Sequence, residues 1–355
     1  MGSGCNGDNN MDMTFPGAEW ETRPPGDLGF DAEKLARVQR WLHEVAEDRP
    51  FQVGIARYGY LAAEWRQGVA ADSMPSQASA AKSYYSTLLG IIVAEGKLSS
   101  PDERVVDYYP EMMDVGEQEG PKPGRYAFEK DRDITFRHLI CNVSGYMKPG
   151  EKPGEVFHYQ TYGMNILTHA MAKIYGCYDA DDPEGLPGCG KVIEEKLRDP
   201  IGGMWMHSHS NFDLWPSARL NIFGYYTQVH TTLRDQLRVG HLWANYGNWN
   251  GFQVAPENYL REATVTNDFI LDNEPEENWK YGHGFWCNDR GMQWADVPRD
   301  SFAASGAGAK HIWMCPQLGL VIAQNPGLWD QFREERDKVG SQNEVIARVV
   351  NAVKE

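Results

Sequence analysis

Ser79 and Lys82 stand three residues apart at the start of a segment with the composition of a buried helix. Residues at this spacing share a helix face, so the lysine amine can lie beside the serine hydroxyl. Serine becomes a nucleophile only when a base takes its proton, and lysine can act as that base if burial or a nearby cation lowers its pKa from about 10 towards neutrality. The pair therefore predicts a serine nucleophile with a lysine base. The alternative is a helix-capping serine followed by a solvated lysine.

Tyr159 is a candidate for a third catalytic group, because it comes just before a second helical segment that ends near Gly176. A phenol held near ammonium or dipole charges can have its pKa of about 10 pulled down, and it can then accept and return a proton. The alternative is a tyrosine that merely caps the start of the helix. The residues alone leave both roles open.

The segments around these residues indicate how they are held. Leu88, Leu89, Ile92 and Val93 recur at helical spacing after Ser79, and Gly96 stands where a left-handed C-cap would end that helix. Residues 51–57 and 61–66 alternate around a Tyr-Gly-Tyr turn and predict a β-hairpin. A helix is expected from residue 31, and the C-terminal part predicts strands near 301–316 and 318–323 and a helix over 343–353.

Composition limits the classes of partner. The 355 residues suffice for one large domain or two closely packed ones, and the formal net charge is −16. Such an excess of acid argues against nucleic acid and anionic membrane surfaces as partners. No run of about 18 apolar residues occurs, so we expect no membrane-spanning segment.

The N-terminus and the cysteines bear on the compartment. Residues 1–18 are expected to be a disordered tail, and Cys5 follows a Ser-Gly pair like the end of a bacterial lipoprotein processing site. This predicts an extracytoplasmic protein, periplasmic or lipid-anchored with its signal removed; a surface cysteine in a cytoplasmic protein is the alternative. Cys177 and Cys189 bracket a loop and could form a disulfide in an oxidising compartment.

Three motifs occur in order along the chain: the Ser-x-x-Lys helix closed by Glu-Gly-Lys-Leu at 95–98, Ile-Thr-Phe-Arg-His-Leu-Ile-Cys-Asn-Val-Ser-Gly at 134–145, and Tyr-Gln-Thr-Tyr-Gly-Met-Asn at 159–165. With these motifs the sequence resembles the serine β-lactamase and penicillin-binding protein superfamily, and most closely the branch of class C β-lactamases, β-lactamase-fold carboxylesterases and nylon-oligomer hydrolases. Asn142 stands where that branch usually has histidine, and Thr161 where it usually has asparagine. Thr161 would lie in the substrate site, but its hydroxyl cannot reproduce the paired donor and acceptor of an amide.

The resemblance implies an α/β (α+β) fold of the β-lactamase/transpeptidase type. An antiparallel sheet built from both chain ends, residues 19–98 and 265–355, would be flanked by helices. Residues 99–264 would form a mainly helical region, and the catalytic cleft would lie between the two parts of one compact unit.

The third motif of the superfamily, Lys-Thr-Gly, is replaced by small residues. By register with the following strand we place it at Ala304-Ser305-Gly306, and we expect a backbone N–H near Ala307 to pair with that of Ser79 as an oxyanion hole. Without the lysine, the cation that usually binds a β-lactam carboxylate is missing. Lys310 lies too far along the strand to replace it.

The resemblance implies a two-step acyl transfer in which Ser79 attacks a small-molecule ester or amide while Lys82 and Tyr159 share the base and acid roles. Carboxylic esters are the first expectation, with amides or peptides second and β-lactams third. A non-hydrolytic binding or sensor module is the alternative of another class. No cofactor or metal is implied, and His207 and His209 are assigned to a polar loop because no further ligand is placed beside them.

Overall fold

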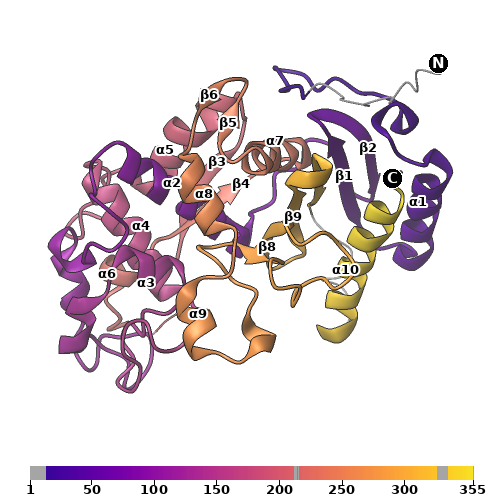
Figure 1. Ribbon diagram of the computed structural model, residues 1–355. Helices are drawn as coiled ribbons and strands as arrows, with labels where there is room; N and C mark the ends of the chain where they lie inside the picture. Colours follow the sequence, from indigo (N-terminus) through magenta and orange to yellow (C-terminus); the bar gives the residue numbers. More distant parts are fainter. Residues whose placement is uncertain (1–12, 212–213, 215, 326–334, 355) are drawn as a thin grey trace, which may run out of the picture.

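The computed structural model describes residues 13–211, 214, 216–325 and 335–354 (Figure 1). A six-stranded sheet lies beside a mainly helical region. The helices are α1 (Ala32–Ala46), α2 (Ala81–Ala94), α3 (Phe136–Ile140), α4 (Tyr162–Ile174), α5 (Gly188–Ile193), α6 (Leu220–Phe223), α7 (Leu233–Ala244), α8 (Glu257–Ala263), α9 (Asp268–Asn273) and α10 (Glu335–Asn351). The strands are β1 (Phe51–Arg57), β2 (Tyr60–Gln67), β3 (Met206–Ser210), β4 (Tyr226–His230), β5 (Asn248–Trp249), β6 (Phe252–Gln253), β7 (Trp286–Cys287), β8 (Phe302–Gly306), β9 (Lys310–Cys315) and β10 (Leu320–Gln324).

The main sheet is antiparallel and joins both ends of the chain, as predicted. Its strand order is β2-β1-β10-β9-β8-β7, so the N-terminal hairpin pairs directly with the last strand. The hairpin turns at Tyr58 and Gly59, whose φ angles of 52° and 83° lie in the left-handed region that suits a two-residue turn. The predicted hairpin is therefore confirmed.

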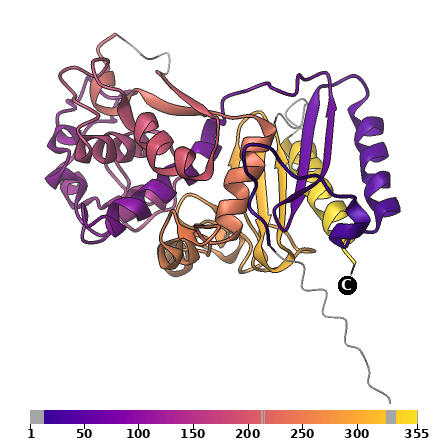
Figure 2. The same cartoon turned by 90° about the horizontal axis from the view of Figure 1, so that it is seen from above.

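One face of the sheet is covered by α1 and α10, on the side away from the helical region (Figure 2). Asp31 caps α1 by accepting a hydrogen bond from the Lys34 backbone N–H at 2.9 Å. Leu35, Val38 and Leu42 are buried against the sheet, as their helical spacing predicts. This layer and its sheet face form a separate apolar core.

The other face is covered by α7 and, beyond it, by the helical region. Glycines allow α7 to approach closely: a Cβ on Gly54 of β1 would lie 2.9 Å from the Leu237 side chain, and one on Gly240 would lie 2.6 Å from Val321. The part of the chain at 99–264, predicted to be mainly helical, thus supplies a helix that rests on the sheet. It also contains the hairpins β3–β4 and β5–β6.

The structure differs from the predicted tail at residues 14–17. Thr14 donates its backbone N–H to the Tyr58 carbonyl at 2.9 Å, and Arg238 of α7 donates to the carbonyls of Pro16 and Gly17, both at 2.8 Å. These bonds fix the segment on the sheet. Cys5 lies outside the described residues.

Two further predictions concern the helical region. Cys177 and Cys189 are free thiols, although the Gly188 N–H donates to the Cys177 carbonyl at 2.8 Å. His207 and His209 lie on strand β3 and not in a loop, because β3 pairs with β4 along its whole length.

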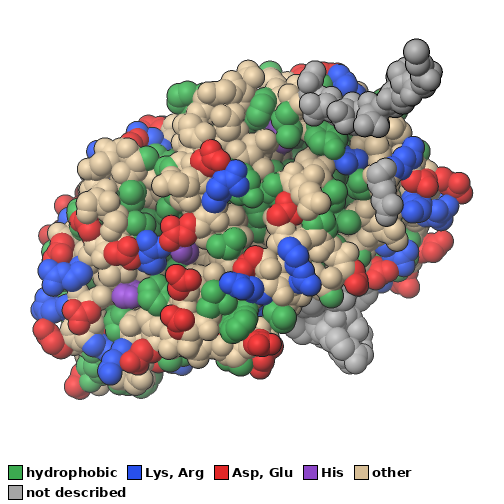
Figure 3. All heavy atoms as spheres, in the orientation of Figure 1, with side chains coloured by type: hydrophobic (Ala, Val, Ile, Leu, Met, Phe, Trp, Pro, Cys, Tyr) green, Lys and Arg blue, Asp and Glu red, His purple; other side chains and the backbone are tan. Residues whose placement is uncertain are grey.

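No helix in the described part of the chain is long and apolar enough to cross a membrane. On the face shown in Figure 3, Lys and Arg side chains are interspersed with Asp and Glu.

Candidate active site

Ser79 lies in a short 3₁₀ turn, Ala78–Ala80, that leads directly into α2. The residue before it, Ala78, has φ of 48°, a conformation that costs energy for any residue with a Cβ. The apolar helix behind the turn is buried almost along its whole length and ends before Gly96, whose φ of 69° confirms the predicted left-handed cap. The serine is therefore held at the rigid N-terminal end of a core helix.

Lys82 occupies the next turn on the same face, as the spacing predicts. Its Nζ lies 2.8 Å from Ser79 Oγ, and the residue is only 1% exposed. Within the described part of the chain no carboxylate forms an ion pair with it. Burial therefore acts unopposed and lowers the pKa of Lys82 to about 7. Near neutral pH a large fraction of this amine is unprotonated.

Tyr159 lies over Lys82, whose Nζ is 4.7 Å from the centre of the phenol ring. The residue is 37% exposed, yet desolvation raises its pKa to about 12, and its hydrogen bond with the Ser79 side chain offsets only part of that effect. The direction is opposite to the sequence prediction of a lowered phenol pKa. The reason is desolvation, which disfavours the charged phenolate.

Asn142 fixes the segment that carries Tyr159. It adopts a left-handed conformation with φ of 59°, and its side-chain and backbone oxygens accept hydrogen bonds from the backbone N–H groups of Gln160 and His158, at 3.0 and 2.8 Å. Its amide also donates to the Tyr281 hydroxyl at 3.0 Å, and the Tyr281 ring packs edge-on against Tyr159. Both neighbours of Tyr159 are thus bound to one buried asparagine, which the sequence marked only as a departure from a family pattern.

Tyr226 is a site residue that the sequence did not indicate. This buried tyrosine of β4 donates its hydroxyl to the Ala78 carbonyl at 2.7 Å, and its hydroxyl also contacts the side chains of Ser79 and Tyr85. Burial raises its pKa, so the hydroxyl stays protonated. It therefore holds the strained turn and also touches the nucleophile. No local motif around Tyr226 could have shown this, because β4 reaches the turn only through the tertiary fold.

The end of β8 lies against the same turn. A Cβ on Gly306 would come within 2.1 Å of the Gln77 carbonyl and 3.0 Å of the Ser79 backbone nitrogen, so only glycine permits this approach. Ser305 precedes it on the strand and pairs with His311, and Ala307 begins the turn towards β9. The predicted third-motif segment is thus adjacent to the Ser79 backbone.

Thr161 lies at the start of α4, two residues after Tyr159. Its side chain does not cap the helix. It lines a pocket of about 320 Å³ together with Gln160, His158 and side chains of the segment at 121–125.

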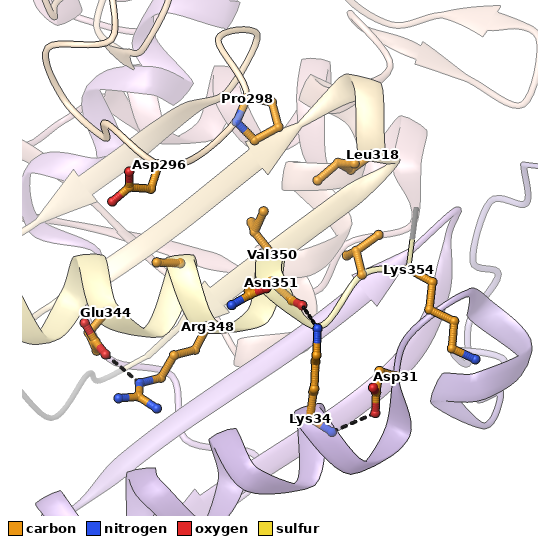
Figure 4. Close-up of a pocket in the computed structure, with 12 residues that line it drawn as sticks. Asp31, Lys34, Asp296, Pro298, Leu318, Glu344, Arg348, Val350, Asn351 and Lys354 are labelled. Carbon is orange, nitrogen blue, oxygen red and sulfur yellow. Dashed lines mark hydrogen bonds and ion pairs between the residues drawn. The ribbon is translucent and has the colours of Figure 1, made fainter.

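A larger cavity of about 990 Å³ lies between α1 and α10 on the opposite face of the sheet (Figure 4). None of the predicted site residues lines it. Several of its charged groups bond to one another or to the backbone: Lys34 Nζ donates to the Asn351 carbonyl at 3.2 Å, and Arg348 pairs with Glu344 at 2.7 Å. This cavity is the space left between two helices packed on the same face of the sheet.

The histidine pair on β3 does not form a metal site with its neighbours. His207 Nδ1 lies 2.7 Å from Glu194 Oε1, and the His209 ring packs edge-on against that of His207. Among the described residues no three His, Cys, Asp or Glu side chains gather as metal ligands would.

Comparisons with known proteins identify the family and the fold. The sequence profile of the Beta-lactamase family matches residues 52–324, which is most of the chain. No protein of curated function matches the sequence.

Solved structures with the same fold span several hydrolases. A putative β-lactamase from Bacteroides dorei superimposes with a TM-score of 0.66 at 14% identity, covering 91% of this chain and 99% of that one. A family VIII carboxylesterase gives 0.61 at 15% identity, covering 94% and 99%. A putative 6-aminohexanoate-dimer hydrolase from Bacillus anthracis gives 0.60 at 15% identity, covering 93% and 87%. With its fold and most of its length matched, this chain belongs to the Beta-lactamase family.

Proposed function

We propose that this protein is a serine hydrolase that acts through an acyl-enzyme on Ser79, with carboxylic esters as its preferred substrates. The observation that carries the proposal is the contact of Ser79 Oγ with a buried lysine amine whose pKa is lowered to about 7. A serine beside an amine that is largely neutral can lose its proton at physiological pH. Membership of a hydrolase family supports the same reading.

In the first step Ser79 Oγ attacks the substrate carbonyl carbon, and its proton passes to Lys82 Nζ. The carbonyl oxygen becomes an oxyanion beside the backbone N–H groups of Ser79 and of the segment after Gly306. Collapse of this intermediate breaks the bond to the leaving group, which takes a proton. The products of the step are the Ser79 ester and a free alcohol or amine.

The geometry favours different roles for the two proton-transferring groups. Lys82 is the base, because its pKa lies near the working pH. Tyr159, with a pKa of about 12, is a neutral phenol that can pass a proton to the leaving group and regain one from Lys82. In the second step water attacks the acyl-enzyme, loses a proton to the same pair and releases the carboxylic acid and free Ser79.

Substrate preference follows from the residues around this centre. Thr161 offers a single hydroxyl, and the third motif is Ala-Ser-Gly without a lysine, so a β-lactam carboxylate lacks its usual cation. An ester needs no such contact. An amide substrate is the second candidate, and the likeness of the fold to a 6-aminohexanoate-dimer hydrolase favours it.

The test is labelling of the intact protein with a fluorophosphonate, followed by mass spectrometry, alongside turnover of p-nitrophenyl acetate and butyrate. We expect one adduct on Ser79, and a loss of turnover of at least about 10³-fold in Ser79→Ala. Full activity of a folded Ser79→Ala protein would falsify the proposal. Neither labelling nor turnover in the wild type would instead indicate a non-hydrolytic binding module.

A further inference from the structure

We infer that the pocket beside Tyr159 binds a carboxylate of the substrate, so that the enzyme prefers esters or amides with an anionic group a few bonds from the scissile carbonyl. The inference rests on the proposed function and specifies its substrate class. Cationic side chains gather in this pocket although the whole chain has a net charge of −16. The pocket is lined by Pro121, Lys122, Arg125, Lys148, His158, Gln160, Thr161 and Tyr162.

Arg125 is the central group. It is partly buried, and its Nε and Nη2 donate to the carbonyls of Met147 and Tyr146, at 2.6 and 3.3 Å. Within the residues that the structure describes, no carboxylate forms an ion pair with it. The main-chain bonds hold the guanidinium in place, and Glu151 and Asp131 act on its charge without pairing with it. A partly desolvated cation that no carboxylate contacts directly favours the binding of an anion.

The other charges of the pocket leave it positive. Lys148, whose side chain is 6% exposed, pairs with Glu151, which also contacts His158 at 3.2 Å. Lys122 is exposed, and no described carboxylate forms an ion pair with it. Two carboxylates, Glu151 and the Lys130-paired Asp131, therefore act on a group of three permanent cations and a histidine.

The pocket adjoins the segment that carries Tyr159. His158 and Gln160 are the chain neighbours of Tyr159, and Thr161 follows one residue later. Consecutive Cα atoms are about 3.8 Å apart, so the pocket wall begins less than ~8 Å from the Tyr159 backbone. The proposal requires the acyl chain or leaving group to pass Tyr159 and to place its carboxylate at Arg125.

The experiment compares matched charged and neutral substrates. Mono-p-nitrophenyl glutarate is set against p-nitrophenyl valerate for the acyl side, and 3-(4-acetoxyphenyl)propanoate against its primary amide for the leaving-group side. Each kcat/KM is divided by the alkaline hydrolysis rate of the same ester. We expect wild type to prefer the charged member of one pair by roughly 10- to 100-fold, the range of a charged hydrogen bond.

Arg125→Gln should abolish that preference, and Lys122→Gln should reduce it without touching any main-chain bond. Arg261→Gln, which removes an equal charge from a surface pair with Glu257, is the matched control and should keep the wild-type ratio. Turnover of the neutral esters without a charged preference in either pair overturns the inference and leaves the proposed function standing.

If no ester is turned over, the proposed function fails, and calorimetric titration with glutarate then decides the inference alone. Binding that is lost in Arg125→Gln supports the anion pocket. No binding by the wild type overturns it.

Discussion

Two regions of this molecule hold a lysine close to the start of a helix, and they differ in what surrounds the charge. Between α1 and α10, Lys34 is exposed and donates to a backbone carbonyl at the edge of a cavity of about 990 Å³. At the start of α2, Lys82 is almost fully buried, has no described carboxylate partner and touches a serine. Lys34 has the ordinary chemistry of a surface lysine. Desolvation lowers the pKa of Lys82 and so prepares its amine to react.

The strongest test of this contrast is the same substitution at both lysines. Lys82→Met should lower kcat/KM for p-nitrophenyl butyrate by roughly 10²–10⁴-fold, the usual contribution of a general base. Lys34→Met should leave that value unchanged. Steady-state kinetics on both variants checks the pair, and equal losses would show that burial does not distinguish the two lysines.

The pH dependence of the reaction sharpens the assignment of the base. Because the pKa of Lys82 is about 7, kcat/KM for a neutral ester should fall about tenfold per pH unit below that value, where the amine is protonated and cannot accept the serine proton. Tyr159→Phe should lower the whole profile without moving this limb. A limb that disappears with Tyr159→Phe would assign the base to the tyrosine instead.

Burial of Lys82 should also appear in stability. Its pKa in the folded chain lies below the ordinary lysine value of 10.5, so between about pH 7 and 10.5 the unfolded chain binds more protons. This group therefore makes stability rise with pH across that window, by up to about 1.4 kcal/mol per pH unit, and its full penalty is present below pH 7.

Urea unfolding at pH 7.5 and 9 measures this slope. Lys82→Met should be more stable than wild type at pH 7.5, by roughly 0.5–2 kcal/mol, and should lose the slope. Lys34→Met, which replaces an exposed lysine, should keep the wild-type rise of stability with pH. A wild-type slope that survives in Lys82→Met would have to come from other groups.

The smallest expected effect concerns the turn that presents the serine. Tyr226→Phe removes the hydrogen bond to the Ala78 carbonyl and should reduce kcat/KM about 5- to 10-fold, corresponding to about 1 kcal/mol. Tyr225→Phe, at the adjacent position, loses only a contact with Glu184 and should behave as wild type. Equal activity of both variants would remove Tyr226 from the site.

The sequence predicted what depends on local spacing. The Ser79–Lys82 contact follows from helix geometry, and the hairpin turn at Gly59 and the cap at Gly96 follow from the conformational freedom of glycine. Tyr159 was found through a motif, because its separation from Ser79 along the chain does not indicate that the two residues lie together in the fold.

What could not be predicted depends on solvation and on distant parts of the fold. The pKa of Tyr159 rises because burial outweighs its hydrogen bond, and no sequence pattern reports that balance. Tyr226 reaches Ser79 from a strand that is far along the chain. The approach of Gly306 to the serine depends on the pairing of β8 with β9, which sets the register of the small residues.

The pairing of β1 with β10 also has a consequence for biosynthesis. The hairpin of β1 and β2 leaves the ribosome early, but β1 lacks its second neighbour until residues 320–324 have been made. At about 5–20 residues per second, the roughly 260 intervening residues take ~13–52 s to translate. During that interval an apolar strand edge is open to pairing with other nascent chains. Slow codons after residue 67, or chains truncated before β10, should therefore lower the yield of native protein through aggregation.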